Sequence, residues 1–209
     1  MAIPASEYPV SLEIDYEERH ERLSTLLRLF LVIPVAIVLG LLFPDIGRDE
    51  AEAGWQMCRW GVGFTVVPLV LTLLFAHRYP RWWYDWNYQL MAFSARVWSY
   101  FWLLRDEYPS LEDEQAVHLR MPYPDLASLS RGLPLIKWLL VLPHVIVLLF
   151  LNLFILPVAF LAWISILFTG KHPRALFDYV LGVMRWDLRV LAYSLLMTTD
   201  EYPPFSLFR

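Results

Sequence analysis

One histidine lies well inside an apolar segment of this chain, which makes it the first residue to consider for chemistry. His144 stands in the run LIKWLLVLPHVIVLL, and an ionisable side chain at membrane depth is a candidate proton or ion site. Such a site would need partners, and the nearest polar residues along the chain are Lys137 and Asn152. The alternative is a neutral imidazole bonded to a carbonyl freed by Pro143. The sequence favours this second interpretation and leaves His144 as an intramembrane candidate.

Two further stretches each contain a stripe of positions at a helical spacing, every three or four residues, and this spacing lines up the charged residues of the stripe on one face. Guanidinium groups grip phosphate, so these stripes predict a lipid headgroup site. The alternatives are a solvated helix face, or Asp–Arg pairing that ties two parts of the chain together. The stripe residues are Asp85 and Arg96 in residues 82–104, and Asp178, Arg185 and Arg189 in residues 175–197. The aromatic residues Trp82, Trp83 and Trp86 complete the predicted lipid or partner surface.

No arrangement typical of an enzyme accompanies these residues. The sequence has no Gly-rich phosphate loop, no paired histidines at metal spacing and no nucleophile elbow. A single cysteine, Cys58, excludes an intramolecular disulfide and a cysteine-built metal site. We therefore expect a protein that is not an enzyme and that uses no cofactor and no metal.

The composition points to a membrane. The chain is 58% hydrophobic and 18% charged, against about 45–50% apolar and about 25% charged in soluble domains. Aromatic residues make up 16% of the chain, with ten Trp. The formal net charge of −4 argues against a nucleic-acid partner, which would favour a basic surface. Membrane lipids are the expected partners, with another membrane protein or a second copy of the chain as further candidates.

A repeat organises the chain into two parts. Residues 79–109 align with residues 171–205, and each segment follows a long apolar run. The aligned pairs include Pro80 with Pro173, Asp85 with Asp178, Arg96 with Arg189, Tyr100 with Tyr193 and Asp106 with Asp200. The apolar runs also match, with Arg28 aligned on Lys137 and Pro34 on Pro143. We predict a tandem duplication, with a first membrane repeat at 1–110 and a second at 111–209.

Each half is predicted to contain an apolar helical hairpin and an amphipathic helix. In the first half, the runs 23–43 and 55–77 have the length of membrane-spanning helices, since 21 residues of helix cover about 31 Å. The mostly apolar helix at 82–104, with one polar stripe, is predicted to lie in the membrane interface.

The second half has the same predicted plan. Its apolar run is too long for one span and is predicted to fold back near Asn152, giving helices at 133–151 and 153–170. The interfacial helix follows at 175–197. Arg28 and Lys137, near the starts of the two apolar regions, are predicted to extend their charges to the headgroups.

Two short segments alternate apolar and polar residues, the pattern of half-buried strands. Their apolar positions are Val10, Leu12, Ile14 and Tyr16 in one, and Val117, Leu119, Met121 and Tyr123 in the other. Because the segments come from matching places in the two halves, we hypothesise that they pair as a two-stranded cytoplasmic ribbon. The predicted fold class is thus an all-α integral membrane protein with internal duplication and this small ribbon.

The distribution of Lys and Arg predicts how the chain is oriented in the membrane. With four spanning or embedded helices, only Arg48 and Arg59 among the 17 Lys and Arg lie towards the far side. Cytoplasmic segments collect Lys and Arg, so both termini are predicted to be cytoplasmic. The rival model has six spans in two inverted repeats, as in transporters, and takes the stripe charges to membrane depth. The four-helix model is favoured.

The second half resembles a family of bacterial membrane proteins known as domain of unknown function 4389. The matching motifs are Leu142-Pro143-His144, Phe168-Thr169-Gly170 with Pro173-Arg174, Arg185-Trp186 with Arg189 and Ala192-Tyr193, and Tyr202-Pro203-Pro204-Phe205. The resemblance covers about residues 130–208. It is looser in the first half, where Val35 replaces the histidine and Ala92-Phe93 replaces Arg-Trp. The resemblance implies a membrane protein with no assigned activity, and it supplies no catalytic residues.

Together these features predict a multi-pass protein of the bacterial inner membrane with a non-catalytic role. We expect an accessory or scaffold protein that binds lipid or a larger membrane complex. The alternative is a small-solute or ion transporter or channel that works at the repeat interface, with His144 and the stripe charges lining it.

Overall fold

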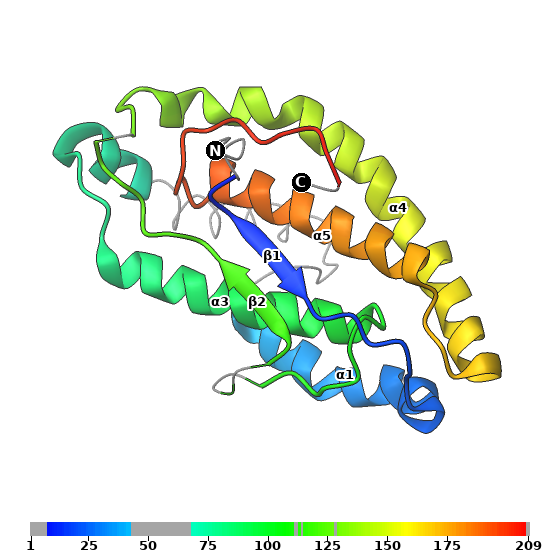
Figure 1. Ribbon diagram of the computed structural model, residues 1–209. Coiled ribbons are helices and arrows are strands. Elements are labelled where there is room, and N and C mark those ends of the chain that lie inside the picture. The colour runs from blue at the N-terminus through cyan, green and yellow to red at the C-terminus, as the bar shows by residue number, and fades with distance from the viewer. Residues whose placement is uncertain (1–7, 43–67, 111–112, 114, 128, 208–209) are drawn as a thin grey trace, which may run out of the picture.

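A computed structural model describes residues 8–42, 68–110, 113, 115–127 and 129–207. Most of the predicted span at 55–77, together with Arg48 and Arg59, lies outside the described residues. The protein is mostly helical with one small sheet (Figure 1). The elements are β1 (Ser11–Ile14), α1 (Arg22–Leu42), the π-helix η1 (Thr72–Ala76), α3 (Arg81–Phe101), β2 (Val117–Arg120), the 3₁₀-helix η2 (Leu133–Leu135), α4 (Lys137–Thr169) and α5 (Arg174–Ser194).

The two alternating segments pair, as hypothesised, and form an antiparallel ribbon. In the register, Leu12 lies opposite Leu119 and Ile14 opposite Val117. These four side chains are buried, while Glu13 and Arg120 on the other face are exposed. A period of two places the apolar residues on one face, so the ribbon has one face to cover.

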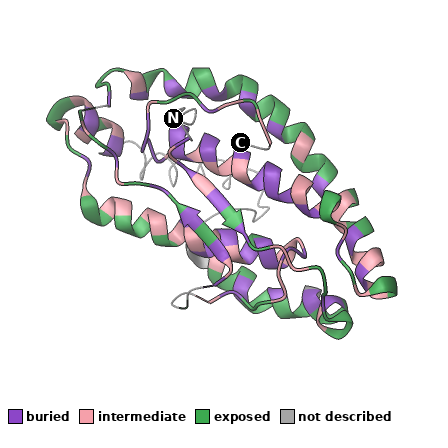
Figure 2. Cartoon of the chain, in the orientation of Figure 1, coloured by how far each residue is buried: buried purple, intermediate pink, exposed green. Residues whose placement is uncertain are grey.

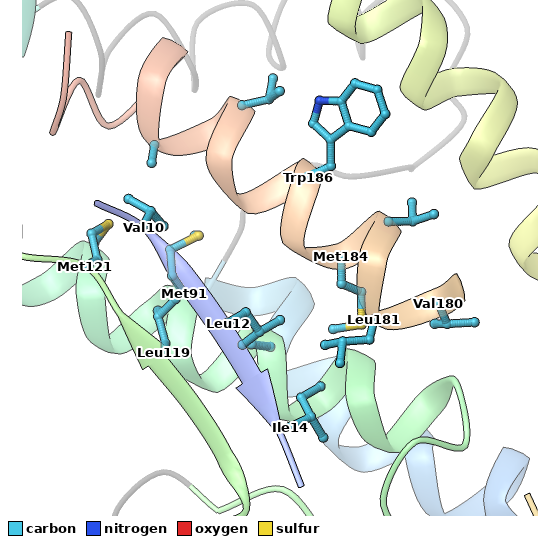
Figure 3. Packing of buried hydrophobic residues seen from close by; sticks show 14 of the residues in the cluster. Val10, Leu12, Ile14, Met91, Leu119, Met121, Val180, Leu181, Met184 and Trp186 are labelled. Atoms are coloured by element: carbon cyan, nitrogen blue, oxygen red, sulfur yellow. The ribbon is translucent and has the colours of Figure 1, made fainter. Parts of the chain in front are cut away.

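The amphipathic helices α3 and α5 cover the buried face of the ribbon. Met91 of α3 and Leu181 and Met184 of α5 join Leu12 and Leu119 in one core (Figure 3). The helices also satisfy backbone groups of the strands. Tyr88 Oη donates to the Leu119 carbonyl at 3.0 Å, and Arg185 Nε donates to the Leu12 carbonyl at 2.6 Å. These bonds occupy strand carbonyls that would otherwise be open to another chain.

The bounds of α3 and α5 agree closely with the predicted helices at 82–104 and 175–197. Each begins after a proline that occupies the N-cap position, Pro80 or Pro173. Each is followed by a buried residue in the left-handed conformation, Leu103 (φ 67°) after α3 and Met197 (φ 53°) after α5. This conformation is strained for a bulky residue and persists where the surrounding packing enforces it.

The apolar run of the second half is a single helix, so the predicted reversal near Asn152 is wrong. Helix α4 runs through 33 residues with Pro143 and Pro157 inside it. The helix continues through Asn152, whose side-chain amide donates to the Leu148 carbonyl one turn earlier at 3.0 Å. Its amide also contacts the carboxylate of Asp187 on α5, at 3.2 and 3.3 Å. The polar residue therefore joins two helices.

Helix α4 packs along α5, with one narrow stripe buried and most of its surface exposed (Figure 2). Among the described residues, α4 is the one helix long and apolar enough to cross a membrane. Helix α1 meets the same test only if its parts Arg22–Arg28 and Phe30–Leu39, bent by 53°, count as one span. A multi-pass arrangement therefore remains a prediction.

Candidate functional site

The stripe residues of α5 make contacts inside the protein. Arg185 reaches the β1 backbone, as described above. Arg189 is buried, donates from Nη1 to the Ser206 carbonyl at 3.2 Å, and lies 6.0 Å from the centre of the Tyr8 ring. Asp178 lies nearer the surface, 3.9 Å from Arg174 one turn earlier. The two arginines thus hold a strand and the C-terminal segment, which differs from the predicted headgroup site.

The stripe of α3 divides into an enclosed part and an open part. Arg96 Nη1 donates to the Ser110 carbonyl at 2.7 Å, as Arg189 does to Ser206. Towards the start of the helix, Asp85 is exposed, and Trp82 and Trp86 are 70% and 54% exposed. Trp83, on the adjacent face, packs against the cluster that contains Tyr79 and Leu129. The predicted partner surface is therefore the open tryptophan face at the start of α3.

His144 is fully buried between α4, α5 and the C-terminal segment. The Trp186 indole N–H donates to its Nδ1 at 3.0 Å, so the neutral imidazole carries its proton on Nε2. The Phe205 ring stacks on it at a centroid distance of 3.8 Å, and the Tyr202 ring lies 4.9 Å away. This geometry gives the imidazole a packing and hydrogen-bonding role. The bond comes from Trp186 and from neither of the nearest polar residues along the chain, Lys137 and Asn152. A bond to the Trp186 indole N–H thus stands where a bond to a carbonyl freed by Pro143 was predicted.

Three of the motifs in the resemblance therefore each contribute aromatic residues at the imidazole. His144 on α4, Trp186 on α5, and Tyr202 and Phe205 of the C-terminal segment form one aromatic cluster. In the first half, Val35 and Phe93 stand at the aligned positions, and they pack together in a small apolar cluster with Val97. In the first half, α1 and α3 therefore make the corresponding contact through apolar side chains, where α4 and α5 use a hydrogen bond.

Two buried ion pairs were missed by the sequence analysis. Arg28 Nη2 pairs with the carboxylate of Asp106, and its guanidinium lies 4.6 Å from the centre of the Tyr100 ring. In the second half, Lys137 Nζ pairs with Asp200 at 2.8 Å and lies 4.8 Å from the Tyr193 ring centre. Both cations are buried, so the prediction that Arg28 and Lys137 reach the headgroups is wrong. A buried cation next to a carboxylate and an aromatic face needs no water or lipid phosphate.

A signal for these pairs was present in the repeat. The alignment matches Arg28 with Lys137, Tyr100 with Tyr193 and Asp106 with Asp200. A charged residue inside an apolar helix, repeated together with an acidic residue elsewhere, indicates a partner across the fold. Spacing along one helix does not show such a pair, because the partners are separated by 78 and 63 positions.

The first ion pair extends into a junction between the two halves. His20 Nδ1 lies 2.8 Å from Asp106 Oδ1, and the His20 ring lies 5.6 Å from the His172 ring. The backbones join there too: His172 N–H donates to the Glu18 carbonyl at 2.9 Å, and His20 N–H to the Gly170 carbonyl at 3.1 Å.

The electrostatics of this junction follow from burial. Burial alone would raise the pKa of Asp106. The bonds from His20 and the Glu21 N–H, together with the Arg28 charge, outweigh burial and hold that pKa below its usual value. Burial lowers the pKa of His172 to about 4, with the neighbouring His20 and Arg28 acting in the same direction. The junction therefore holds one charged ion pair beside a neutral, buried imidazole.

These groups are arranged to hold segments together. No group of three or more His, Cys, Asp or Glu in the described part of the chain could bind a metal ion. Each stripe arginine, each ion-paired cation and Trp186 directs at least one donor to an acceptor of the same chain. The open features are the tryptophan face of α3 and the apolar surfaces of α1 and α4.

Comparison with known proteins supports the family assignment of the second half. Residues 134–206 match the model of the family described as "Domain of unknown function (DUF4389)". The matched segment holds α4, α5 and the aromatic cluster around His144. No curated protein and no solved structure matches the chain.

Proposed function

We propose that this chain is a non-catalytic scaffold or accessory protein of the bacterial inner membrane, attached to the bilayer through α4. One observation carries the proposal. The exposed surface of α4 is apolar along its whole length, and it includes Leu139, Phe150, Leu153, Leu161 and Phe168. An apolar surface of this extent is normally covered by lipid or by a partner protein.

The internal bonding favours a scaffold over the alternative of a transporter or channel. A solute path needs polar groups that face it and that rearrange. Here Arg185, Arg189 and Lys137 are bound to backbone carbonyls. We further propose that the chain arose by tandem duplication. The recurring cation–carboxylate–tyrosine clusters support this, as do the left-handed residues that follow α3 and α5.

Membrane attachment is tested by fractionation of cells that express the chain, followed by extraction at alkaline pH. We expect the protein to stay in the membrane pellet. The variant Phe150→Lys with Leu153→Lys places two charges on the apolar face at about 2.5–3.5 kcal/mol each, and it should move to the soluble or aggregated fraction. Glu13→Lys, on the exposed face of the ribbon, is the matched control and should stay with the membrane. Wild-type protein in the alkaline supernatant would contradict the proposal.

The transporter alternative is tested in liposomes that contain the purified protein. The scaffold proposal predicts no flux of small ions above that of empty liposomes. Flux that is lost in His144→Ala but kept in Val35→Ala, its aligned position, would overturn the scaffold proposal in favour of a transporter.

A further inference from the structure

Helix α4 is longer than a bilayer requires. Its 33 residues correspond to about 50 Å of helix, whereas the hydrocarbon core is about 30 Å thick. At a tilt of about 40°, the upper end of the usual range, such a helix still covers about 38 Å along the membrane normal. The apolar exposure nevertheless continues to both ends, from Ile136 and Trp138 to Phe168. A crossing helix would therefore leave apolar side chains outside the core.

Along its whole length, α4 packs against other parts of the protein, and these parts carry charged residues. Its buried stripe, which starts at its first residue, consists of Lys137, Val141, His144, Leu148, Ile155, Ala162 and Ile166. Helix α5 packs on α4, and β1 packs on α5 in turn. If α4 crossed the membrane, α5 and the ribbon would cross with it. Asp187 and the exposed Glu13 and Arg120 would then enter the core, at about 2.5–3.5 kcal/mol for each charge.

Basic residues stand at both ends of α4. Arg131 precedes it and is exposed. Lys171 and Arg174 follow it and are exposed, and each also faces one carboxylate of the chain, Glu18 at 2.6 Å and Asp178 at 3.9 Å. Arg22, at the start of α1, donates to the Phe168 carbonyl in the last turn of α4 at 3.3 Å. Phospholipid headgroups on the cytoplasmic side are anionic and attract such residues. A helix that lies flat places the basic residues of both its ends in one headgroup layer. A crossing helix places the basic residues of one end on the far side of the membrane.

We propose that α4 lies in the plane of the membrane, with its exposed apolar face among the acyl chains of the cytoplasmic leaflet and α5 and the ribbon on the cytoplasmic side. This inference rests on the proposed membrane attachment and specifies its geometry. The partner of the α4 surface is then one leaflet of anionic phospholipid. The chain is bound to one side of the bilayer at this helix and does not pass through it there.

The depth of three positions tests the proposal. Leu139, Phe150 and Leu161 are 67%, 59% and 55% exposed, and they share one face of α4 because they follow at three-turn intervals. Each is changed to Cys in a Cys58→Ser background, spin-labelled and measured in vesicles of anionic phospholipid for collision with oxygen and with a water-soluble nickel complex. A flat helix gives the same depth at all three positions. A crossing helix places Phe150 deeper than the other two by up to about 16 Å along the helix axis, which would overturn the proposal.

A buried position and a second measurement complete the test. A label at Leu148, on the stripe that faces α5, should collide with oxygen much less than the label at Phe150. If the labels at the three exposed positions collide with oxygen and with the nickel complex as labels on a water-soluble protein do, the proposed membrane attachment itself is wrong. That outcome is distinct from unequal depth.

Arg131→Cys and Arg174→Cys flank the helix, and a membrane-impermeant maleimide should label both from the cytoplasmic side. Labelling from opposite sides would also overturn the flat geometry.

Discussion

The two halves contain the same buried cluster but use it differently. In the second half, Asp200 binds Lys137 and the backbone N–H of Ser130, so the cluster closes within its own half. In the first half, Asp106 binds Arg28 and also His20, whose ring lies against His172 of the other half. The comparison teaches that one local solution, a cation held by a carboxylate over a tyrosine ring, serves in one place to fasten a segment and in the other to join two halves.

The largest expected effect comes from removing the two carboxylates. Asp106→Ala and Asp200→Ala each leave a buried cation without its partner, which should lower the free energy of unfolding by about 3–5 kcal/mol. Asp106→Ala should lie at the upper end, because His20 and the Glu21 N–H lose their acceptor as well. Denaturant unfolding in detergent measures both. Asp178→Ala, in an exposed pair, is the control, with an expected loss of at most about 1 kcal/mol. An Asp106→Ala loss no larger than that control would contradict the cluster's role.

Acid should weaken the junction in the first half. The pKa of His172 is lowered to about 4 in the folded protein, from 6.5 for the free group. Below pH 6.5 the unfolded chain therefore takes up a proton that the folded chain resists. Stability is lost as pH falls from about 6.5 to about 4, by about 3 kcal/mol in total. Unfolding as a function of pH should show this slope in the wild type and a flatter one in His172→Gln. An unchanged slope in His172→Gln would remove this residue as the cause.

A carboxyl in the second half should give the opposite slope. Burial raises the pKa of Asp187 to about 6 from 3.8, with the Asn152 bond opposing the rise. The folded protein then holds a proton more readily than the unfolded chain. Asp187 therefore contributes stability below pH 3.8 that is lost as pH rises through about 6. Asp187→Asn should make the total acid slope between pH 4 and 6 steeper. A shallower slope would show that the sign assigned to Asp187 is wrong.

A smaller effect is expected where the halves differ in one contact. His144→Val leaves the buried Trp186 indole N–H without an acceptor, which should cost about 1–3 kcal/mol in addition to any packing loss. The double variant His144→Val with Trp186→Phe copies the Val35–Phe93 contact of the first half. It should recover part of that loss, because both hydrogen-bonding groups are gone. A double variant less stable than the sum of the two single variants would contradict this interpretation.

The smallest change in stability is expected at the open face of α3. Trp82→Ala and Trp86→Ala remove exposed rings, and each should change the free energy of unfolding by no more than about 0.5 kcal/mol. Their aligned positions on α5 are Ala175 and Tyr179, and the Tyr179 hydroxyl donates to the Leu151 carbonyl of α4 at 2.9 Å. Tyr179→Ala should therefore cost more than either tryptophan variant. Vesicle binding that falls in the tryptophan variants while unfolding is unchanged would locate a lipid contact there.

Local patterns in the sequence predicted the elements well and their partners poorly. The alternation of Leu12 and Ile14 predicted a strand because period two is visible in a few residues, and the stripe of α5 predicted a helix for the same reason. The hairpin at Asn152 was wrong because a uniformly apolar run has no periodicity that marks a turn. The burial of Lys137 was missed because its partner Asp200 is far along the chain. Only the comparison of the two repeats contained that information.

The antiparallel pairing of β1 and β2 has a consequence for biosynthesis. Strand β1 emerges from the ribosome well before its partners, because β2 lies more than a hundred residues later and the helix that covers it, α5, later still. Because synthesis proceeds at about 5–20 residues per second, the backbone groups of β1 stay unpaired for on the order of ten seconds. During that time it is a site for aggregation or for a chaperone. Strand β1 is thus made before most of the described chain but is among the last of its elements to reach native contacts.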